Sequence, residues 1–250
     1  MNEGKSIGAF LALWNGVNDA ALVREYETWH AFEHVPERVG SPGFAWAQRY
    51  AAPAGATAQP AYFTLYGLDS LDALRTARYQ DLLDHPSDWS ARMRGVLSDF
   101  RREPCEAIGV QGISIAACLA TMPMRIRPTA LSKLSQQLAA LVDSGAAVSA
   151  ILGRVDLQGG HPLDRTDASR EQTAGLDVVV LLQHLRREPL QAAVQALLDV
   201  PGADAALRAP VAHYEFQSLV RQRDLPHPLT QRQPPRPELR HTFNITGDKT

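Results

Sequence analysis

The hydrophobic and polar residues of positions 1–112 follow the order strand, helix, strand, strand, helix, strand. Residues 7–15 alternate as a strand does and close at Asn15-Gly16, and Asp19 is placed to cap a helix that runs to about His34. The other elements of this half are expected as strands over residues 44–50, 62–67 and 106–112, with a helical region over 71–100 that is interrupted at His85-Pro86. The order βαββαβ is typical of a ferredoxin-like unit.

The same order of elements is predicted a second time, roughly 105 residues further along the chain. Leucines at positions 131, 134, 138 and 141 have helical spacing and predict a helix over residues 131–143. The remaining elements are expected as strands over 113–121, 150–157, 176–184 and 211–220, a polar loop over 159–175, a helix from 190 to 198 and a shorter helix near 204–208. Sequence identity between the two halves is faint, so what repeats is the order of the secondary-structure elements.

A ferredoxin-like sheet carries helices on one face only, so its other face has to be covered. Two such sheets from one chain meet this need when they pack against each other. We therefore expect an α+β protein of two tandem ferredoxin-like (βαββαβ) units, residues 1–112 and 113–225, packed sheet to sheet. Residues 226–250 are rich in proline and indicate either a disordered tail or an extended arm on a neighbouring subunit.

The composition is that of an ordinary globular protein. The 250 residues carry a net charge of −2, which gives no general electrostatic attraction to nucleic acid or to an anionic membrane. The two cysteines, Cys105 and Cys118, lie in apolar stretches and are expected as buried free thiols. The apolar run near the N-terminus is too short for a signal peptide or a membrane span, and a cytoplasmic location fits best.

Residues 26–50 concentrate the candidate chemistry. Pro36 is expected to end the first helix, and Ser41-Pro42-Gly43 to turn the chain into an aromatic strand. Ionisable and aromatic side chains crowded at a helix end are what a small-molecule pocket needs. The residues that fall within about three helical turns are Trp29, His30, Glu33, His34, Glu37 and Arg38.

His34 is the first candidate for catalysis, because a neutral imidazole takes up and returns a proton near pH 7. Glu33 or Glu37 is a candidate to orient it, and Arg38 or Arg49 to anchor a carboxylate or an enolate. The alternative is structural. In that reading, His34 and Arg38 tie the helix end to the turn that follows.

His30, Glu33 and His34 also spell H-x-x-E-H, a zinc motif in which two histidines share a helix face. Glu103 or Glu106 is the candidate for a third ligand. The chain is far smaller than the peptidases that use this motif, and the proline after the second histidine interrupts the helix. We therefore expect no metal.

The aromatic residues of the first half are candidates for ligand binding, although most aromatic residues simply fill a core. On alternating strand positions, Phe44, Trp46, Gln48 and Tyr50 are expected on one face, as are Tyr62, Thr64 and Tyr66. His85 and Trp89 follow a helix break and are placed either at the pocket rim or, for His85, in solvent. The predicted substrate-binding residues are Tyr26, Trp29, His30, Trp46, Arg49, Tyr50, Tyr62, Tyr66, His85 and Trp89.

The first half carries Trp29, the run Glu33-His34-Val35-Pro36-Glu37-Arg38, Pro42-Gly43-Phe44 and Arg49-Tyr50. This pattern resembles the dimeric α/β-barrel superfamily, and more narrowly its EthD-like and uncharacterised members. The segment from His85 to Trp89, with Arg92, is similar to the pattern of their second helix. The resemblance covers roughly residues 7–110 and implies an intramolecular dimeric α/β barrel. The second half lacks these motifs, which favours a single site in the first half.

The resemblance implies a fold more strongly than a reaction, because the superfamily includes cofactor-free monooxygenases, polyketide cyclases, muconolactone isomerase and haem-degrading enzymes. We expect a cofactor-independent enzyme that acts on a small aromatic, lactone or polyketide-like metabolite by proton transfer through His34. The alternatives are a non-catalytic binding or assembly protein and, with less support, a haem protein like chlorite dismutase that would use His184 or His213. The expected partners are a small-molecule ligand and a second copy held by the C-terminal arm.

Overall fold

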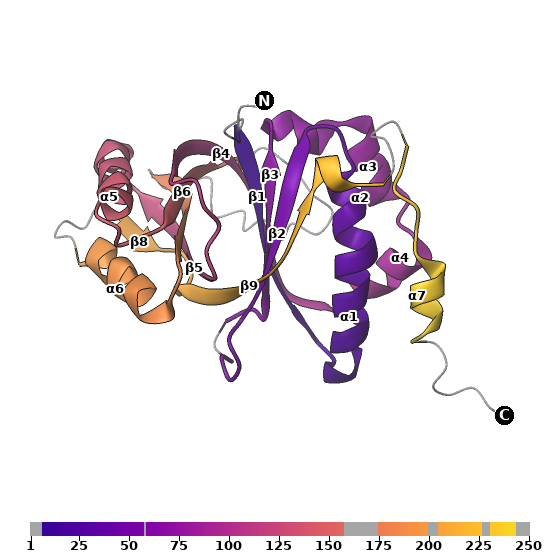
Figure 1. Cartoon of the computed structure of the whole chain (residues 1–250). Helices are drawn as coiled ribbons and strands as arrows, with labels where there is room; N and C mark the ends of the chain where they lie inside the picture. The colour runs from indigo at the N-terminus through magenta and orange to yellow at the C-terminus, as the bar shows by residue number, and fades with distance from the viewer. Residues whose placement is uncertain (1–6, 58, 158–174, 200–204, 227–230, 244–250) are drawn as a thin grey trace.

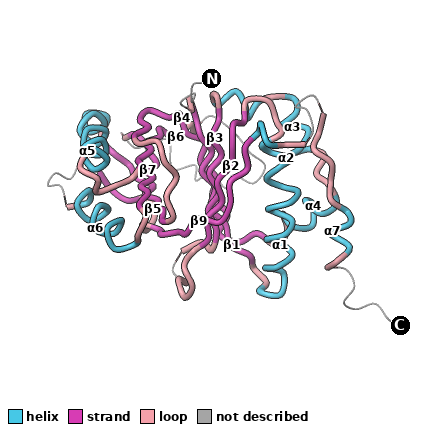
Figure 2. Tube along the Cα trace, in the orientation of Figure 1, coloured by secondary structure: helices cyan, strands magenta, loops and turns pink. Residues whose placement is uncertain are grey.

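The structure is a computed structural model that describes residues 7–57, 59–157, 175–199, 205–226 and 231–243. These residues form a strand barrel in the middle of the molecule with helices on two opposite sides, as Figures 1 and 2 show. The predicted loop over 159–175 and the start of the tail lie almost wholly outside the described residues. Among the described residues, no helix combines the length and apolar character needed to cross a membrane.

The first half has the predicted βαββαβ order. The break at His85-Pro86 is confirmed, because it separates two helices, α3 and α4. The bounds of the elements are β1 (Ala9–Val17), α1 (Val23–Trp29), α2 (Val35–Val39), β2 (Phe44–Ala51), β3 (Tyr62–Leu68), α3 (Ala77–Asp84), α4 (Asp88–Arg94) and β4 (Leu97–Gln111).

The second half repeats the order, and the predicted helix over 131–143 and strand over 176–184 are confirmed at both ends. The helix expected near 204–208 is wrong, because residues 205–207 form a strand that pairs with β5 beyond the stretch of β5 that β9 covers. Backbone groups left open by β9 thereby gain partners. The bounds are β5 (Cys118–Ile126), α5 (Leu131–Asp143), β6 (Ser149–Val155), β7 (Leu176–His184), α6 (Arg187–Leu198), β8 (Ala205–Leu207), β9 (Ala212–Arg221) and α7 (Pro237–His241).

The strands close into a barrel by edge pairing between the two halves. The order is β7-β6-β4-β1-β3-β2-β9-β5-β8, and β7 also pairs with β5, so every described strand except β8 belongs to the closed ring. Within each half, the four ring strands have ferredoxin-like order, β4-β1-β3-β2 and β9-β5-β7-β6. The predicted α+β architecture of two units in one intramolecular barrel is confirmed.

β4 is longer than predicted and begins at Leu97, where the sequence had indicated helix through residue 100. Its first part pairs with β1, and its last part, from Cys105 to Gln111, pairs with β6 of the other half. The strand extends because β1 offers backbone partners along its whole length. One strand therefore serves both units.

Alternating strand positions divide the side chains between the barrel interior and the helical layers. A register shift in β2 places Phe44 with the helix-facing residues, while Trp46 and Tyr50 pack in the interior cluster. The expectation that all four alternate residues of β2 share a face is therefore wrong for Phe44. Tyr62 and Tyr66 share one face of β3, as predicted, and this face meets the helices.

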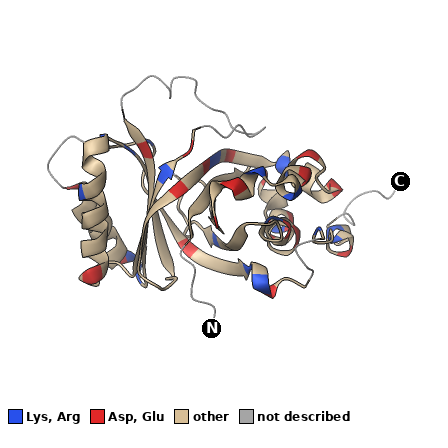
Figure 3. Cartoon of the chain, turned by 90° about the horizontal axis from the view of Figure 1, so that it is seen from above, with Lys and Arg blue, Asp and Glu red and all other residues tan. Residues whose placement is uncertain are grey.

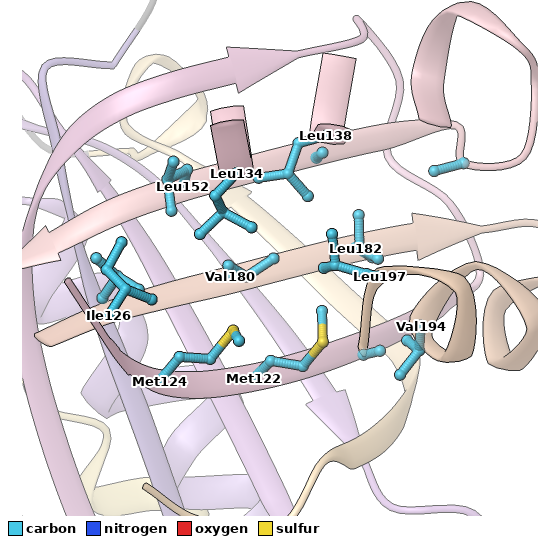
Figure 4. Close-up of a cluster of buried hydrophobic side chains, with 14 of the residues drawn as sticks. Met122, Met124, Ile126, Leu134, Leu138, Leu152, Val180, Leu182, Val194 and Leu197 are labelled. Atoms are coloured by element: carbon cyan, nitrogen blue, oxygen red, sulfur yellow. The ribbon is translucent and has the colours of Figure 1, made fainter. Parts of the chain in front are cut away.

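Apolar side chains hold each helical layer to its side of the barrel. In the second half, α5 and α6 lie on β5, β6 and β7, and Figure 4 shows Leu134, Leu138, Val194 and Leu197 against Met122, Val180 and Leu182. The two helices bury apolar area that stabilises this half. Acidic and basic residues are interspersed over the described surface (Figure 3), in line with the small net charge.

Closure of the barrel can be tested at Gly153 of β6, whose missing side chain makes room for Phe10 of β1. A Cβ atom at Gly153 would lie 2.3 Å from the Phe10 ring, whereas one at Gly109 of β4 would meet nothing nearer than 3.6 Å. We expect Gly153→Ala to lower the free energy of unfolding by about 1–3 kcal/mol through overpacking. Gly109→Ala should stay within about 0.5 kcal/mol of wild type. Equal urea unfolding curves for the two variants would contradict the interior packing.

Candidate functional site

The first helix contains a wide π turn at the predicted site. α1 ends at Trp29, residues His30–His34 form a π-helical segment, and α2 continues the same helix to Val39. The Val35 N–H bonds to the His30 carbonyl five residues back, which is the π-helical pattern. Such turns are frequent at functional sites.

The prediction that Pro36 ends the helix is wrong. A proline ring in a regular α-helix clashes with the carbonyl four residues earlier and has no N–H to donate. Here the widened turn directly precedes Pro36 and makes room for the ring, and the helix runs on until Gly40. The proline therefore accounts for the π turn, and the π turn keeps Glu37 and Arg38 on the helix.

The two histidines of the π turn lie one above the other against the sheet. Their ring centroids are 5.4 Å apart with planes 29° from parallel, and the His34 ring lies 4.4 Å from the Trp29 ring. His30 Nε2 is 3.4 Å from Thr64 Oγ1 on β3. Within the described residues, the buried Nδ1 atoms of both histidines have no hydrogen-bond partner.

Both imidazoles are held in the neutral form. Burial lowers the pKa of His30 well below 6.5, and the positive charges of Arg49 and Arg38 add to the effect. Burial also lowers the pKa of His34, together with the charges of Arg38 and Arg94. Burial and nearby cations both disfavour an imidazolium. At neutral pH each ring therefore carries one lone pair that can accept a proton or a hydrogen bond.

A cavity of about 50 Å³ opens beside these rings, between the helices and the outer face of the first sheet. This is room for several water molecules and about a third of the 150 Å³ in which an engineered apolar cavity holds benzene. It has both polar and apolar walls. The lining residues are Leu13, Asn15, Tyr26, Trp29, His30, His34, Arg38, Tyr79, Leu83, Arg94, Leu97, Phe100 and Arg102.

Three arginines line the cavity and supply positive charge there, Arg38, Arg94 and Arg102. Arg38 lies over the Tyr79 ring at 5.8 Å, and its Nη1 is 3.9 Å from Glu37 Oε2. Arg94 donates to the carbonyls of Leu82 and Leu83, which hold its guanidinium in place. Burial lowers the pKa of Arg94. An anion that forms in the cavity would meet fixed charges that water does not screen.

Glu33 and Glu37 are buried, but neither is bonded to His34 as the sequence had suggested. Glu33 accepts a hydrogen bond from Ser87 Oγ and one from the Arg236 backbone N–H at 2.7 Å. Glu37 accepts from Arg232 Nε at 3.1 Å and from its Nη2 at 2.9 Å. Burial raises the pKa of Glu37, and the charges of Arg38 and Arg232 oppose that shift.

The C-terminal arm, residues 231–243, lies on its own chain. Figure 1 shows it in yellow against the first helix layer, with α7 beside α1 and α4. Leu239 and Phe243 pack onto the cluster around Trp89, and Arg240 Nη1 lies 3.3 Å from Asp88. The described part of the arm therefore packs on its own chain, and a homodimer that uses the arm stays a prediction.

Five of the predicted site residues line the cavity, and the others lie elsewhere. Arg49 and Tyr66 are close by on the same sheet face, with the Arg49 guanidinium 5.3 Å from the Tyr26 ring and Tyr66 Oη buried without a partner in the described residues. Trp46 and Tyr50 face the barrel interior. Those at the cavity are Tyr26, Trp29, His30, His34 and Arg38.

Three predicted binding residues serve other purposes. His85 is exposed and bonds through Nδ1 to Asp81 at 3.1 Å, so the solvent reading is correct. Trp89 is buried and donates from Nε1 to Glu25, and Tyr62 donates from Oη to Glu27. These contacts tie α1 to α4 and to β3.

The sequence did not reveal the wall of the cavity that α3, the end of α4 and β4 provide. Phe100 was hidden by the mistaken extension of the helix to residue 100, and the strand that carries Arg102 was expected to begin only at residue 106. Asn15 was read as a turn residue, but its side chain exchanges hydrogen bonds with Tyr26 Oη at 2.9 and 3.1 Å. The buried position of an Asn inside an apolar strand was the available signal.

The described residues of the second half do not fit a haem. His184 Nδ1 accepts from the Arg186 backbone N–H, and His213 is held by Gln59 through its backbone. The described cavity beneath α5 and α6, of about 140 Å³, has an apolar wall of residues such as Met124 and Leu197 and is lined by neither histidine. Within the described residues no three His, Cys, Asp or Glu side chains form a metal-ligand group.

No protein-family model and no curated protein matches the sequence. In structure the chain is similar to an anthrone oxidase-like protein at 12% identity and a TM-score of 0.53, covering 86% of this chain and 92% of that one. A putative monooxygenase from Lactobacillus acidophilus NCFM gives 8% identity, a TM-score of 0.51 and coverage of 87% and 97%.

Chlorite dismutase from Candidatus Nitrospira defluvii in complex with imidazole gives 11% identity, a TM-score of 0.55 and 96% coverage of both chains. These likenesses confirm the fold, a dimeric α+β barrel built from two units. Sequence identities this low do not show that this chain has the activity of any of these proteins. The narrower resemblance to EthD-like members stays a prediction.

We expect the protein to lose stability when the contact between Arg232 of the arm and Glu37 is removed. Arg232→Met leaves the buried Glu37 Oε1 without the two guanidinium N–H groups that donate to it, and we expect the free energy of unfolding to fall by about 1–3 kcal/mol. Arg240→Met on the same arm removes only a contact to the exposed Asp88 and should cost less than about 0.5 kcal/mol. Urea unfolding at pH 7 measures both. If Arg232→Met lowered the free energy of unfolding no more than Arg240→Met does, the stabilising role of the Arg232–Glu37 contact would be contradicted.

Proposed function

We propose that the helix-side cavity of the first half is the active site of a small-molecule enzyme in which His34 acts as the general base. The substrate class is a small aromatic or lactone-like carbonyl compound with an acidic C–H bond. The cavity of about 50 Å³ receives the reacting end of this molecule, and side chains such as Leu83 and Phe100 move aside for its ring.

The observation that carries the proposal is a neutral imidazole with an unused nitrogen in a cavity lined by cations. His34 Nδ1 is buried without a partner in the described part of the chain, and the pKa of the ring is lowered by burial and by Arg38. A base needs a free lone pair within reach of its proton. A purely structural histidine would bond both of its polar atoms.

The surroundings of His34 support the chemistry of a developing anion. When the base takes the proton, the electron pair of the C–H bond moves onto the carbonyl oxygen and forms an enolate. Arg38 and Arg94 supply the charge that stabilises this enolate, and the buried site strengthens the attraction. Trp29 and Tyr26 offer aromatic faces for a ring.

The enolate then has two outcomes. Return of the proton to another carbon gives isomerisation, whereas addition of the enolate carbon to dioxygen, with the proton going to the new peroxide oxygen, gives an oxygenated product. The similarity to an anthrone oxidase-like protein and to putative monooxygenases favours oxidation as the second step. All of the residues used belong to this chain, and no cofactor enters these steps.

The proton-transfer step is tested by solvent exchange, which does not depend on what happens next. Wild-type protein in D₂O at pH 7.5 should speed the exchange of the α-protons of 2-tetralone, followed by NMR. His34→Ala should slow this exchange by about 10²–10⁴-fold at unchanged fold. His85→Ala, which alters an exposed histidine outside the cavity, should leave the rate as in wild type.

A wild-type rate equal to that of buffer, or a His34→Ala rate equal to that of wild type, would overturn the role of His34. Circular dichroism and melting temperature check that each variant is folded. Saturable binding of 2-tetralone without exchange would point to the alternative, a binding protein of the same fold.

A further inference from the structure

A second and larger cavity lies at one mouth of the barrel, on the side of the first sheet opposite the helices. Its volume is about 500 Å³, within the range of about 300–1,000 Å³ typical of small-molecule sites. Its walls come from both halves, with Trp46 and Gln48 from β2, Ile151 from β6, Gln183 from β7 and Leu219 from β9. The helix-side cavity shares none of these residues.

A chain of hydrogen bonds at the base of this cavity has a fixed direction. The Ala116 backbone N–H donates to Gln183 Oε1 at 2.8 Å, and this identifies the oxygen, since a backbone N–H only donates. Gln183 Nε2 then donates to Tyr50 Oη at 3.1 Å. The Tyr50 hydroxyl donates in turn to Gln48 Oε1 at 2.5 Å.

The direction of these hydrogen bonds leaves the side-chain amide N–H of Gln48 without an acceptor in the series. Gln48 is 5% exposed, and its Nε2 makes no hydrogen bond to any residue that the structure describes. Burial raises the pKa of the Tyr50 hydroxyl, so it keeps the proton that it donates. This nitrogen opens onto the cavity rather than being fully buried, and a ligand carbonyl that takes the place of water there accepts the hydrogen bond.

Trp46 provides a flat wall beside this donor. The ring lies directly on Gly67 of β3, where an added Cβ atom would be 2.3 Å from Trp46 Cε2. Only a glycine lets the indole approach the strand this closely. Trp46 is half-buried and lines the cavity, so a planar ligand can lie against its ring.

The rim of the cavity is apolar and exposed. Ile113 is fully exposed, Ile115 is 42% exposed, and both lie in the segment between β4 and β5. Isolated apolar residues on a surface are normal, but these two border one cavity. Arg221 is the one cation among the lining residues, and its Nη1 lies 3.5 Å from Asp224 Oδ2.

We propose that the barrel mouth is a second ligand site, which takes an uncharged, planar, apolar molecule with a carbonyl oxygen that accepts a hydrogen bond from Gln48 Nε2. The ring lies on Trp46, and the rim isoleucines cover its edge. The site does not depend on the reaction in the helix-side cavity, and its ligand is a separate molecule.

The test compares 2-acetylnaphthalene with 2-ethylnaphthalene, which has nearly the same shape and no carbonyl. Calorimetric titration of wild type should give about tenfold tighter binding of the ketone, the effect of one hydrogen bond to this amide donor. The side-chain amide signal of Gln48 in a ¹⁵N-correlated NMR spectrum, assigned by its loss in Gln48→Met, should shift with the ketone only.

Gln48→Met removes the donor at similar volume and should bring the affinities for the two compounds to within twofold of each other. Trp46→Ala should weaken both by tenfold or more, and His34→Ala should change neither. Melting temperatures show which variants are folded, and the wild-type NMR result stands even if a variant is not. No saturable binding, equal affinities in wild type, or a Gln48 signal that does not move would each overturn the proposal.

Discussion

The pairing of strand edges between the two halves is the constraint on which the rest of the structure depends. Each ferredoxin-like sheet would present two open edges, and the β2–β9 and β4–β6 pairings satisfy all of them at once. Closure fixes which strand positions point inward, so large side chains such as Trp14 and Phe63 fill the interior. The helices are left to cover the outside, and the space between helix and sheet becomes available for a site.

The first sheet therefore has a candidate site on each face. On the outer face, the π turn places two neutral imidazoles over β3, and buried cations keep them neutral. On the inner face, the Gln183–Tyr50–Gln48 chain ends in a donor that faces a cavity. Each site offers a polar atom without a partner among the described residues, the buried Nδ1 of His34 on the outer face and the cavity-facing Nε2 of Gln48 on the inner face. The C-terminal arm also stabilises the outer-face site, because it donates hydrogen bonds to Glu33 and Glu37 on the helix that carries the histidines.

The sequence predicted the architecture better than the site. Alternation and leucine spacing indicated the repeated βαββαβ order, since both reflect burial on one face. The sequence pattern wrongly predicted that the helix ends at Pro36. Whether a proline ends a helix depends on whether the turn before it can widen, and here it does. The prediction of helix through Phe100 hid part of the cavity wall that β4 provides. Tyr50 and Trp46 were expected to bind one ligand together with His34, but they lie on the opposite face of the sheet from His34. The face is set by a β-bulge in β2, and the residue pattern does not show where such a bulge occurs.

The central claim is that the π turn holds two neutral imidazoles in a ligand cavity. The most direct measurement is an NMR titration of the ring ¹⁵N shifts of His30 and His34 between pH 8 and pH 5, with signals assigned by His30→Gln and His34→Ala. Because burial and nearby cations lower both pKa values, we expect both rings to stay neutral well below the ordinary value of 6.5. Titration of either ring at its ordinary value would mean that it is open to water, and the account of the site would be wrong.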